Sequence, residues 1–373
     1  MVIGGQMRIA FVSDWVLPRL GGIELQLKDL AVELQSRHCE VHVHTTTPGP
    51  TEVAGIPVTR TPARLAPGLG FAISPNLVAT IRSELAAGRY TILHVHLSIV
   101  SPLGYAAIVA GRDLGLPTVV TFHSVLGFTS QVLRLADRLT GWSKWPLALT
   151  GVSERVASEL RRAAPNLEVT TLPNGVNPDF WRVPRNRQDA PILAVSAMRF
   201  NRRKRPLALL HAFRRAQTTA SRRQMKLSIA GMGPEVGAMQ RYIARHDLQN
   251  DVTLLGIQSR ETLRDLYSRA HLFVLPSIQE AFGIAALEAR CASLPVIAMR
   301  AAGCSDFLAG AGQPLADNDT ELAAHIARLA TDDVLREHLA APDPGLDRFA
   351  WPEVVQAHLD CYARIAASSG RPR

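Results

Sequence analysis

Short apolar segments alternate with segments of helical periodicity along the chain, and this alternation constrains the fold more than any other feature. The apolar run 8–13 is followed, after a loop, by Ile23, Leu27, Leu30 and Leu34 at helical spacing. The pattern predicts further strands near 40–45, 92–95, 118–122 and 148–152, and helices near 75–87, 100–114 and 154–162. Strands that alternate with helices in this way form a parallel sheet covered on both faces.

The same alternation starts again after the Pro- and polar-rich stretch 174–189. New strands are predicted at 192–196, 226–230, 252–255, 272–275 and 296–298, with helices between them. A chain of 373 residues also exceeds the roughly 250–300 residues that one hydrophobic core supports. We therefore expect an α/β protein with two Rossmann-like doubly wound domains facing a central cleft, joined by a linker near 178–190. The amphipathic segment 351–365 could pack on either half.

The charge balance favours an anionic partner. Lys and Arg number 41 against 32 Asp and Glu, a formal net charge of +9, which suits nucleotides, phospholipid surfaces or nucleic acid. Nucleic acid is disfavoured because the basic residues are scattered through helices without a recognition motif. No apolar run approaches the ~20 residues needed to span a bilayer, and the N-terminus lacks a signal-peptide pattern. Four widely spaced cysteines fit a reducing cytoplasm.

The segment 276–288, PSIQEAFGIAALE, carries the strongest local signal for chemistry. It follows a predicted strand and opens a helix near Gly283, where unpaired N–H groups and the helix dipole suit a phosphate. Glu280 and Glu288 flank that point and could accept hydrogen bonds from hydroxyls on either side of a diphosphate. The alternative is a plain loop carboxylate and a solvated helix residue.

A second candidate is the loop after the strand at 192–196, where Arg199 and Lys204 follow the strand's carboxyl end. Cations there could neutralise a diphosphate leaving group. The run 202–205 alone is more typical of a solvated or anion-attracting surface than of a catalytic site, and its position in a switch-point loop is what favours a role for Arg199 and Lys204.

In the first half, Gly21 and Gly22 precede a predicted helix. They could form a phosphate-binding nest or simply permit a tight turn. His123 follows an apolar strand, so it should emerge at the strand end facing the cleft, where it can donate a hydrogen bond or carry a proton. We interpret His94 and His96 as structural residues or as residues that support the site. Asn174 and Gly175 are typical of a turn, which could equally border the crevice.

The triplet at 317–319, DND, resembles a metal-binding DxD motif, but it precedes a predicted helix from 321. Asp and Asn are good helix caps, so we predict a cap. No essential metal is expected, because Arg, Lys and helix dipoles can supply the positive charge.

Taken together, these motifs resemble the family 4 glycosyltransferases, which are retaining enzymes of GT-B architecture. The resemblance covers nearly the whole chain and rests on eight features in the family's order: GGIE at 21–24, HVH at 94–96, TFH at 121–123, VSE at 152–154, PNGVN at 173–177, Arg199 with Lys204, AGMGP at 230–234, and the E-x7-E spacing of Glu280 and Glu288.

The resemblance implies a role for each candidate residue on the donor side. Glu280 would hold hydroxyls of the donor sugar, Glu288 the ribose hydroxyls, and Arg199 with Lys204 the diphosphate. The residues expected to border the nucleotide or its phosphates through their backbone or side chains are Phe282, Gly283, Ile284, Gly231, Gly233 and Ile257.

On the other side, the resemblance implies that Gly22, preceded by Gly21, lies beside the phosphates or the acceptor, and His123 near the donor sugar. The last helix of such enzymes crosses back onto the first domain, which gives domains of 1–180 completed by 351–373, and 181–350. Lys204 is followed by Arg205 where many relatives have Gly, which could alter this loop.

The resemblance implies transfer of a hexose from a nucleotide-diphosphate sugar to a hydroxyl by front-face substitution. The nucleotide sugar is a co-substrate, with UDP favoured and GDP the alternative, and no further cofactor is expected. TFHSVLGF at 121–128 is also similar to enzymes that glycosylate phosphatidylinositol, which adds a lipid acceptor and peripheral contact with the inner membrane face as a hypothesis. The rival functions are a GT-B sugar-nucleotide epimerase or phosphorylase, and a non-catalytic module that binds nucleotide sugars or anionic lipids.

Overall fold

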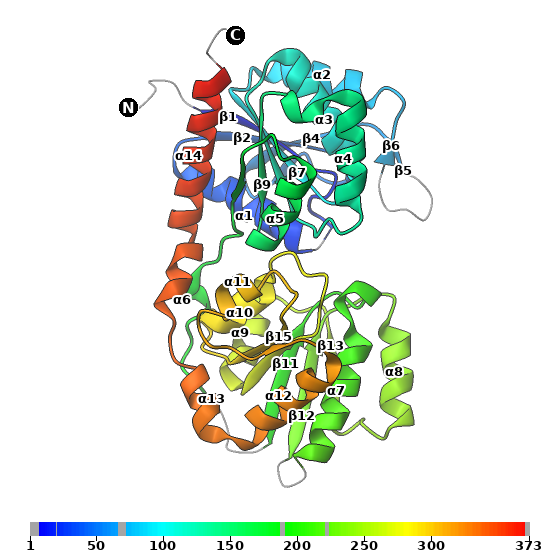
Figure 1. Cartoon of the computed structure of the whole chain (residues 1–373), viewed down its shortest axis with the longest axis vertical. Coiled ribbons are helices and arrows are strands. Elements are labelled where there is room, and N and C mark those ends of the chain that lie inside the picture. The colour runs from blue at the N-terminus through cyan, green and yellow to red at the C-terminus, as the bar shows by residue number, and fades with distance from the viewer. Residues whose placement is uncertain (1–6, 20, 66–71, 187–190, 221–223, 370–373) are drawn as a thin grey trace. The chain divides into compact units, whose positions relative to one another are not determined.

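The chain divides into two compact units, each with its own parallel sheet (Figure 1). Unit 1 comprises Met1–Gly175 and Trp351–Arg373, and unit 2 comprises Val176–Ala350. The computed structural model describes residues 7–19, 21–65, 72–186, 191–220 and 224–369. Residues 187–190 of the predicted linker and 370–373 of the last segment lie outside the described residues.

Unit 1 is built on an eight-stranded sheet in the order β10-β9-β8-β7-β1-β2-β4-β3. Every neighbouring pair is parallel except β3 with β4. The strands are β1 (Arg8–Val12), β2 (Glu40–Thr45), β3 (Glu52–Val53), β4 (Ile56–Arg60), β7 (Ile92–Leu97), β8 (Thr118–Phe122), β9 (Leu147–Gly151) and β10 (Val169–Thr171). A separate two-stranded ribbon consists of β5 (Arg64–Leu65) and β6 (Ala72–Ile73).

The central strands β7 and β8 are buried at every position, as is typical of parallel strands that are covered on both faces. The helices of unit 1 are α1 (Gly22–Ser36), α2 (Leu77–Gly88), α3 (Pro102–Leu114), α4 (Thr129–Thr140), α5 (Glu154–Ala163) and α14 (Trp351–Ser369), with a 3₁₀ turn η1 at Trp142–Lys144.

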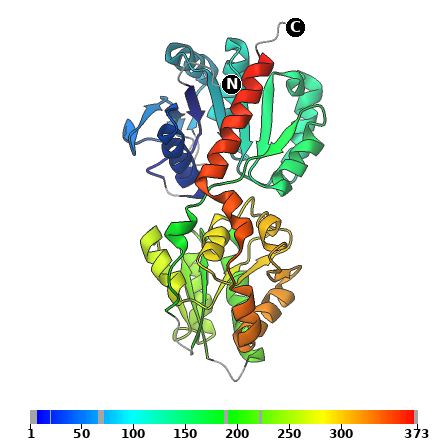
Figure 2. The ribbon, with the colours of Figure 1, turned by 90° about the vertical axis from the view of Figure 1, so that its left-hand side faces the viewer.

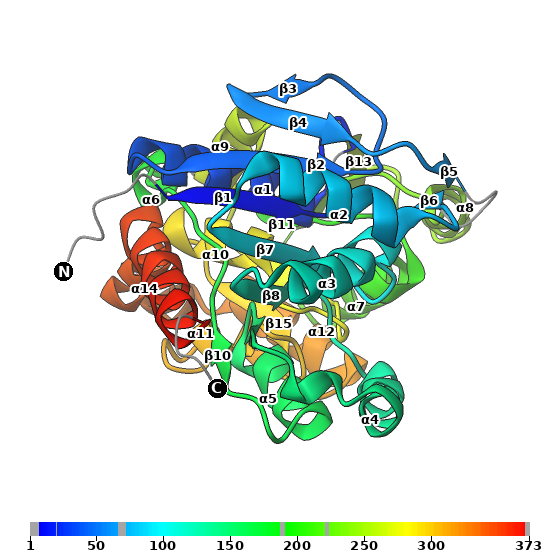
Figure 3. The same ribbon diagram turned by 90° about the horizontal axis from the view of Figure 1, so that it is seen from above.

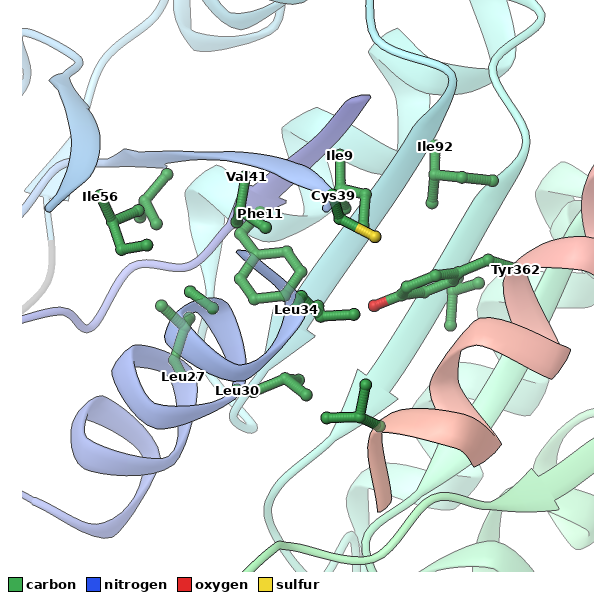
Figure 4. Close-up of a cluster of buried hydrophobic side chains, with 14 of the residues drawn as sticks. Ile9, Phe11, Leu27, Leu30, Leu34, Cys39, Val41, Ile56, Ile92 and Tyr362 are labelled. Atoms are coloured by element: carbon green, nitrogen blue, oxygen red, sulfur yellow. The ribbon is translucent and has the colours of Figure 1, made fainter. Parts of the chain in front are cut away.

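The last helix, α14, completes the core of unit 1. It contacts α1, β8 and β9, and Figure 2 shows it in red lying along this unit between α1 and α5. Tyr362 is fully buried and belongs to one cluster with Phe11, Leu34 and Ile92; Figure 4 shows its ring pointing from α14 toward those side chains. Burial of a large apolar side chain stabilises a fold by about 1.5–3 kcal/mol, so α14 is an integral element of unit 1.

Unit 2 has a six-stranded, fully parallel sheet in the order β13-β12-β11-β14-β15-β16. Its strands are β11 (Ile192–Ala197), β12 (Met225–Ala230), β13 (Val252–Gly256), β14 (Leu272–Leu275), β15 (Val296–Met299) and β16 (Leu315–Ala316). Its helices are α6 (Pro178–Trp181), α7 (Pro206–Thr219), α8 (Val236–Arg245), α9 (Arg260–Arg269), α10 (Ile284–Cys291), α11 (Ser305–Leu308), α12 (Asp319–Thr331) and α13 (Asp333–Leu339), with 3₁₀ turns η2 (Arg202–Lys204) and η3 (Pro344–Phe349).

The strand order of each sheet defines where a ligand can bind. In unit 2 the chain runs outward from β11 to one edge and then returns to start again at β14, so the switch point lies between β11 and β14. In unit 1 the corresponding point lies between β1 and β7. Ligands of doubly wound sheets bind at the carboxyl ends of the strands at such points. The predicted α/β class with two parallel sheets is confirmed.

Candidate functional site

Two loops meet at the switch point of unit 2, and together with helix α10 they carry all four of the predicted donor-site charges. The loop after β11 contains Arg199 and Lys204, and the loop after β14 contains Glu280 and leads into α10, which carries Glu288. Since β11 and β14 are neighbouring parallel strands, their carboxyl ends lie at the same edge of the sheet. Two sequence segments that are far apart in the chain are thereby brought together.

Lys204 and Glu280 form an ion pair across these loops. The Lys204 Nζ atom lies 2.6 Å from the Glu280 Oε2 atom, and their side chains are only 27% and 12% exposed. Asn201 caps the 3₁₀ turn by accepting a hydrogen bond from the Lys204 amide at 3.0 Å. The lysine is therefore held at both its backbone and its ammonium group. A partly buried, oriented cation of this kind is suited to a phosphate.

Arg205, the residue that departs from the family pattern, links the same two loops. Its backbone is left-handed, with φ of 56°, a conformation that glycine adopts without strain and other residues rarely adopt. Its guanidinium donates to the Pro276 carbonyl at 3.1 Å and to both carboxylate oxygens of Asp319 at 2.7 and 2.8 Å. The loop thus keeps the left-handed turn that a glycine would make, and the arginine adds contacts that a glycine cannot.

The N-terminus of α10 opens beside this pair. Gly283 is its N-cap residue, with φ of 86° and no side-chain capping bond. A Cβ atom at this position would lie 2.9 Å from the Cβ atom of Cys304, so backbone geometry and space both require glycine. The first N–H groups of a helix have no partner inside it, so the start of α10 at Gly283 and Ile284, with the positive end of the dipole, is suited to an anion.

Packing holds this helix start in place. Phe282 is buried and contacts the rings of Phe307 and Phe349. The Glu280 carbonyl accepts a hydrogen bond from the Gly303 amide at 2.8 Å. Glu288 is buried on α10. It is not the solvated helix residue that the alternative interpretation of the sequence required.

The loops after β12 and β13 form a second wall of the same edge. Gly231 has φ of 140°, and a Cβ atom there would come within 1.8 Å of the Met198 carbonyl oxygen. At Gly233 a Cβ atom would come within 2.4 Å of the Phe200 carbonyl oxygen. Both glycines are therefore required for the close approach of this loop to the loop that carries Arg199.

Two apolar side chains stand exposed on these loops. Met232 follows β12 and is 58% exposed, and Ile257 follows β13 and is 57% exposed. The Gly231 amide donates to the Gly256 carbonyl at 2.7 Å, which joins the two loops. The arrangement offers an apolar surface of the kind against which a flat nucleobase can pack.

In unit 1, His123 follows β8 and lies next to His96 of β7. The His123 Nε2 atom and the His96 Nδ1 atom are 3.0 Å apart. Burial and the neighbouring His358 lower the pKa of His123 from 6.5 to about 3, and burial lowers the pKa of His358 to about 4. Burial also lowers the pKa of His96 well below its usual value. These imidazoles are neutral at pH 7, so His123 can donate or accept a hydrogen bond without bringing a charge.

His94 belongs to a buried hydrogen-bond chain that ties α14 to the sheet. Thr150 Oγ1 contacts the Val120 carbonyl, Thr121 Oγ1 lies 2.6 Å from Thr150 Oγ1, and His94 Nε2 lies 2.7 Å from Thr121 Oγ1. The Tyr362 hydroxyl lies 2.7 Å from His94 Nδ1. If Thr150 donates to the carbonyl, each hydroxyl donates onward and His94 donates through Nε2 and accepts from Tyr362. Its place in this chain agrees with the structural role predicted for His94.

The turn at Asn174 and Gly175 borders a small pocket inside unit 1. The pocket is also lined by His96, His123 and His358. Gln26 of α1 holds the turn, because its side-chain amide donates to the Gly175 carbonyl at 2.8 Å and accepts from the Gly175 amide at 2.9 Å. The buried Nε2 atom of His96 has no hydrogen-bond partner among the described residues. The turn therefore borders a pocket within unit 1, while its place at the predicted crevice between the domains stays a prediction.

The first helix begins at Gly22, one residue before the predicted start. Gly21 is its N-cap and makes no side-chain capping bond, and Gly22 is exposed. The start of α1 follows the carboxyl end of β1, next to the switch point of unit 1. Both interpretations of these glycines, a phosphate nest and a turn, are compatible with this geometry.

Asp14, which was not predicted from the sequence, lies at the same switch point. It is buried and accepts hydrogen bonds from the amides of Leu103 and Gly104, at 3.0 and 3.1 Å, at the start of α3. Burial raises its pKa from 3.8 to about 6 despite these bonds. The signal in the sequence was its position directly after an apolar strand, the same signal that identified His123.

The DND triplet is a helix cap. Asn318 accepts a hydrogen bond from the Glu321 amide at 3.0 Å, and Glu321 accepts one from the Asp317 amide at 2.9 Å. Asp317 pairs with Arg300, and Asp319 with Arg205. Among the described residues, no group of three or more His, Cys, Asp or Glu side chains is placed to hold a metal ion.

Comparison with known protein families matches both halves of the chain. Residues 20–180 match the model described as Glycosyltransferase Family 4, and residues 178–341 match the model described as Glycosyl transferases group 1. The two models together span residues 20–341, and the chain is a glycosyltransferase of the family 4/group 1 type. The family resemblance predicted from the motifs is confirmed, and the glycosyltransferase has GT-B architecture.

Individual relatives are distant but cover most of the chain. One component of the phosphatidylinositol N-acetylglucosaminyltransferase of Homo sapiens is 26% identical over 80% of this chain, which spans 63% of the human protein's length. Alpha-maltose-1-phosphate synthase of Mycobacterium tuberculosis is 25% identical over 97% of this chain and all of its own. The HepE protein of Anabaena, solved with UDP and glucose, superimposes with a TM-score of 0.75 at 19% identity, over 96% of this chain and all of its own.

Within the part of the chain that the structure describes, no helix combines the length and apolar character needed to cross a membrane.

Proposed function

We propose that this glycosyltransferase transfers a hexose, with retention of anomeric configuration, from a nucleotide-diphosphate sugar to a hydroxyl group of an acceptor. The observation that carries the proposal is the Lys204–Glu280 pair at the switch point of unit 2, beside the uncapped start of α10. A cation, a helix N-terminus and two carboxylates are the groups that a sugar joined to a diphosphate requires.

Each predicted residue receives a role on the donor. Lys204 and Arg199 bind the diphosphate, and the amides at Gly283 and Ile284, beside Phe282, bind its oxygens. Glu280 accepts hydrogen bonds from hydroxyls of the sugar, and Glu288 from the ribose. Gly231 and Gly233 let the backbone approach the nucleotide, and Ile257 packs near the base.

UDP is the favoured nucleotide and GDP the alternative. UDP is supported by HepE, a structural neighbour of this chain that was solved with UDP and glucose.

The reaction we propose is a front-face substitution. The bond between the anomeric carbon and the phosphate oxygen breaks, and the nucleoside diphosphate leaves with the electron pair. The acceptor oxygen bonds to the same face of that carbon, and its proton passes to the departing phosphate oxygen. The protein contributes positioning and charge stabilisation, for which Lys204 is already held by Glu280 and Asn201, and Arg199 supplies a second charge from the same loop. His123, which is neutral, donates a hydrogen bond to the sugar.

A membrane lipid with free hydroxyls is the acceptor we favour. The support is the net charge of +9 and the similarity to a relative named for its action on phosphatidylinositol. A basic protein is attracted to an anionic lipid surface, which raises its local concentration of acceptor. On this proposal the enzyme works at the inner face of the cytoplasmic membrane.

The test is an assay of the purified protein with UDP-glucose, UDP-N-acetylglucosamine and GDP-mannose, each with vesicles that contain phosphatidylinositol. The expected result is release of nucleoside diphosphate together with a glycolipid whose new linkage has the donor's configuration by NMR. Sugar 1-phosphate formation would instead indicate a phosphorylase, and an isomerised sugar nucleotide an epimerase. Binding of the sugar nucleotides without turnover would leave only a binding module.

A further inference from the structure

Helix α4 presents an apolar face to solvent. Although it is strongly amphipathic in sequence, α4 has no buried residue. Four side chains of residues 128–140 are widely exposed: Phe128 at 76%, Val132 at 50%, Leu135 at 58% and Leu139 at 81%. They are four of the eleven large apolar side chains that are exposed among the described residues. We call them the α4 apolar face.

The spacing of these residues puts them on one side of the helix. Positions 128, 132, 135 and 139 are separated by four, three and four residues, and residues at such separations lie above one another on an α-helix. The result is a continuous strip more than two turns long. Contiguous apolar surface on a folded protein marks an interaction site more often than scattered single residues do.

The opposite side of α4 is fastened to unit 1. Asp137 accepts hydrogen bonds from the amide and the hydroxyl of Ser143, at 2.7 and 2.8 Å. The indole of Trp142 donates to the Leu133 carbonyl at 3.1 Å. The helix also contacts α5, and Figure 3 shows it at the outer margin of unit 1 beside that helix. These contacts orient the apolar face away from its own unit.

The charges around the strip are positive. Arg134 and Arg138 lie along one border of the apolar face and are exposed, and Lys144 follows in the next turn and is exposed too. The acidic residue of this segment, Asp137, is used in binding Ser143. An apolar strip bordered by cations fits the interface of an anionic bilayer, where the apolar side chains enter the acyl boundary and the cations meet lipid phosphates.

We propose that the α4 apolar face, with Arg134, Arg138 and Lys144, docks unit 1 onto an anionic phospholipid bilayer. The inference rests on the proposed function in one respect, namely that the acceptor is a membrane lipid. His123 lies five residues before Phe128, at the carboxyl end of β8. Docking through α4 therefore places the lipid surface next to the edge of the sheet where the acceptor is expected.

The experiment is flotation of the full-length protein with phosphatidylcholine vesicles, with or without phosphatidylglycerol. The wild type is expected to float with the phosphatidylglycerol vesicles, and less so at high salt. Replacing the strip (V132Q, L135Q, L139Q) or the cations (R134Q, R138Q) should each lower the partition coefficient by about tenfold or more, since apolar burial and each basic residue contribute separately. Val334→Gln, at a site 83% exposed in unit 2, and Arg214→Gln, exposed on α7, are the matched controls and should float like the wild type.

Three results would overturn the inference. The wild type could fail to float with anionic vesicles, or the strip variant could float as well as the wild type. Alternatively, the wild type could be a dimer without lipid that the strip variant converts to a monomer, which would make the face a contact between copies. Far-UV circular dichroism verifies that each variant is folded. Donor hydrolysis without vesicles, measured on the same samples, separates this inference from the proposed function, because it depends on unit 2 and not on α4.

Discussion

The switch point of unit 1 has buried, neutral imidazoles and one buried carboxyl group, that of Asp14, whereas the switch point of unit 2 lies among charged side chains held by ion pairs. His94, His96, His123 and His358 have pKa values lowered by burial. In unit 2, Lys204 pairs with Glu280, and Arg205 pairs with Asp319. Two sheets with the same class of topology thus offer different chemistry at equivalent places.

This difference suits the two partners of the proposed reaction. A diphosphate is doubly charged and needs cations and amide donors, which unit 2 provides. An acceptor hydroxyl and a sugar are neutral and need hydrogen-bonding groups that bring no competing charge, which the histidines of unit 1 provide. Variants that change a charged or titratable side chain in either unit test this difference. Their turnover is the readout for unit 2, and the pH dependence of their stability is the readout for unit 1.

The largest effect is expected from Lys204→Ala. Loss of a preorganised cation that stabilises the leaving group typically lowers the rate by about 10²–10³-fold, and we expect this decrease in kcat for sugar transfer. Arg203→Ala is the control, because Arg203 is exposed in the same 3₁₀ turn and has no role in the proposal. Equal turnover by the two variants would show that the charge of Lys204 does not contribute to catalysis.

The second effect is a dependence of the stability of unit 1 on pH. The pKa of His358 falls from 6.5 in the unfolded chain to about 4 in the fold. Its contribution is therefore present above pH 6.5 and is lost as the pH falls toward 4, by roughly 2–3 kcal/mol for a shift of this size. His123 acts in the same direction. Calorimetric unfolding between pH 7.5 and 5 should show the transition of unit 1 moving to lower temperature more than that of unit 2.

Replacement of single histidines sharpens this test. His358→Gln should reduce the pH slope of unit 1, because one buried neutral imidazole is removed. His338→Gln, at an exposed position in unit 2, should leave the slope unchanged. If the two units lose stability in parallel on acidification, the contrast between them is wrong.

The smallest effect concerns Arg205, whose left-handed backbone costs about 1–2 kcal/mol in a residue other than glycine. Arg205→Gly loses the contacts to Asp319 and Pro276 but relieves this cost, while Arg205→Ala loses the contacts and keeps it. Denaturant unfolding should therefore find the Gly variant more stable than the Ala variant by about 1 kcal/mol. Equal stabilities would show that the loop does not need a left-handed residue here.

The sequence predicted several strands to the residue. The bounds of β2, β8 and β14 agree with the predicted residues, whereas β7, which is buried at every position, extends two residues beyond the predicted 92–95. The strand β4 was missed, since Pro57 interrupts its apolar pattern and β4 lies near the edge of the sheet. The helix α4 was missed although its sequence is strongly amphipathic.

The candidate site was predictable in its parts but not in its contacts. The positions of Lys204 and Glu280 after strands were visible in the sequence, yet their pairing depends on β11 lying next to β14, which requires the strand order. The partners of Asp14 are amides about 90 residues further along the chain. The histidine cluster likewise joins β7, β8 and α14, which sequence periodicity cannot align.

The most direct test of the central claim, that unit 2 binds the donor through its charged switch point, is a crystal structure of the protein with UDP. The account predicts the diphosphate at the N-terminus of α10, with Lys204 in contact with a phosphate oxygen and Glu288 in contact with the ribose. A diphosphate bound among the histidines of unit 1, away from Lys204 and Gly283, would contradict it.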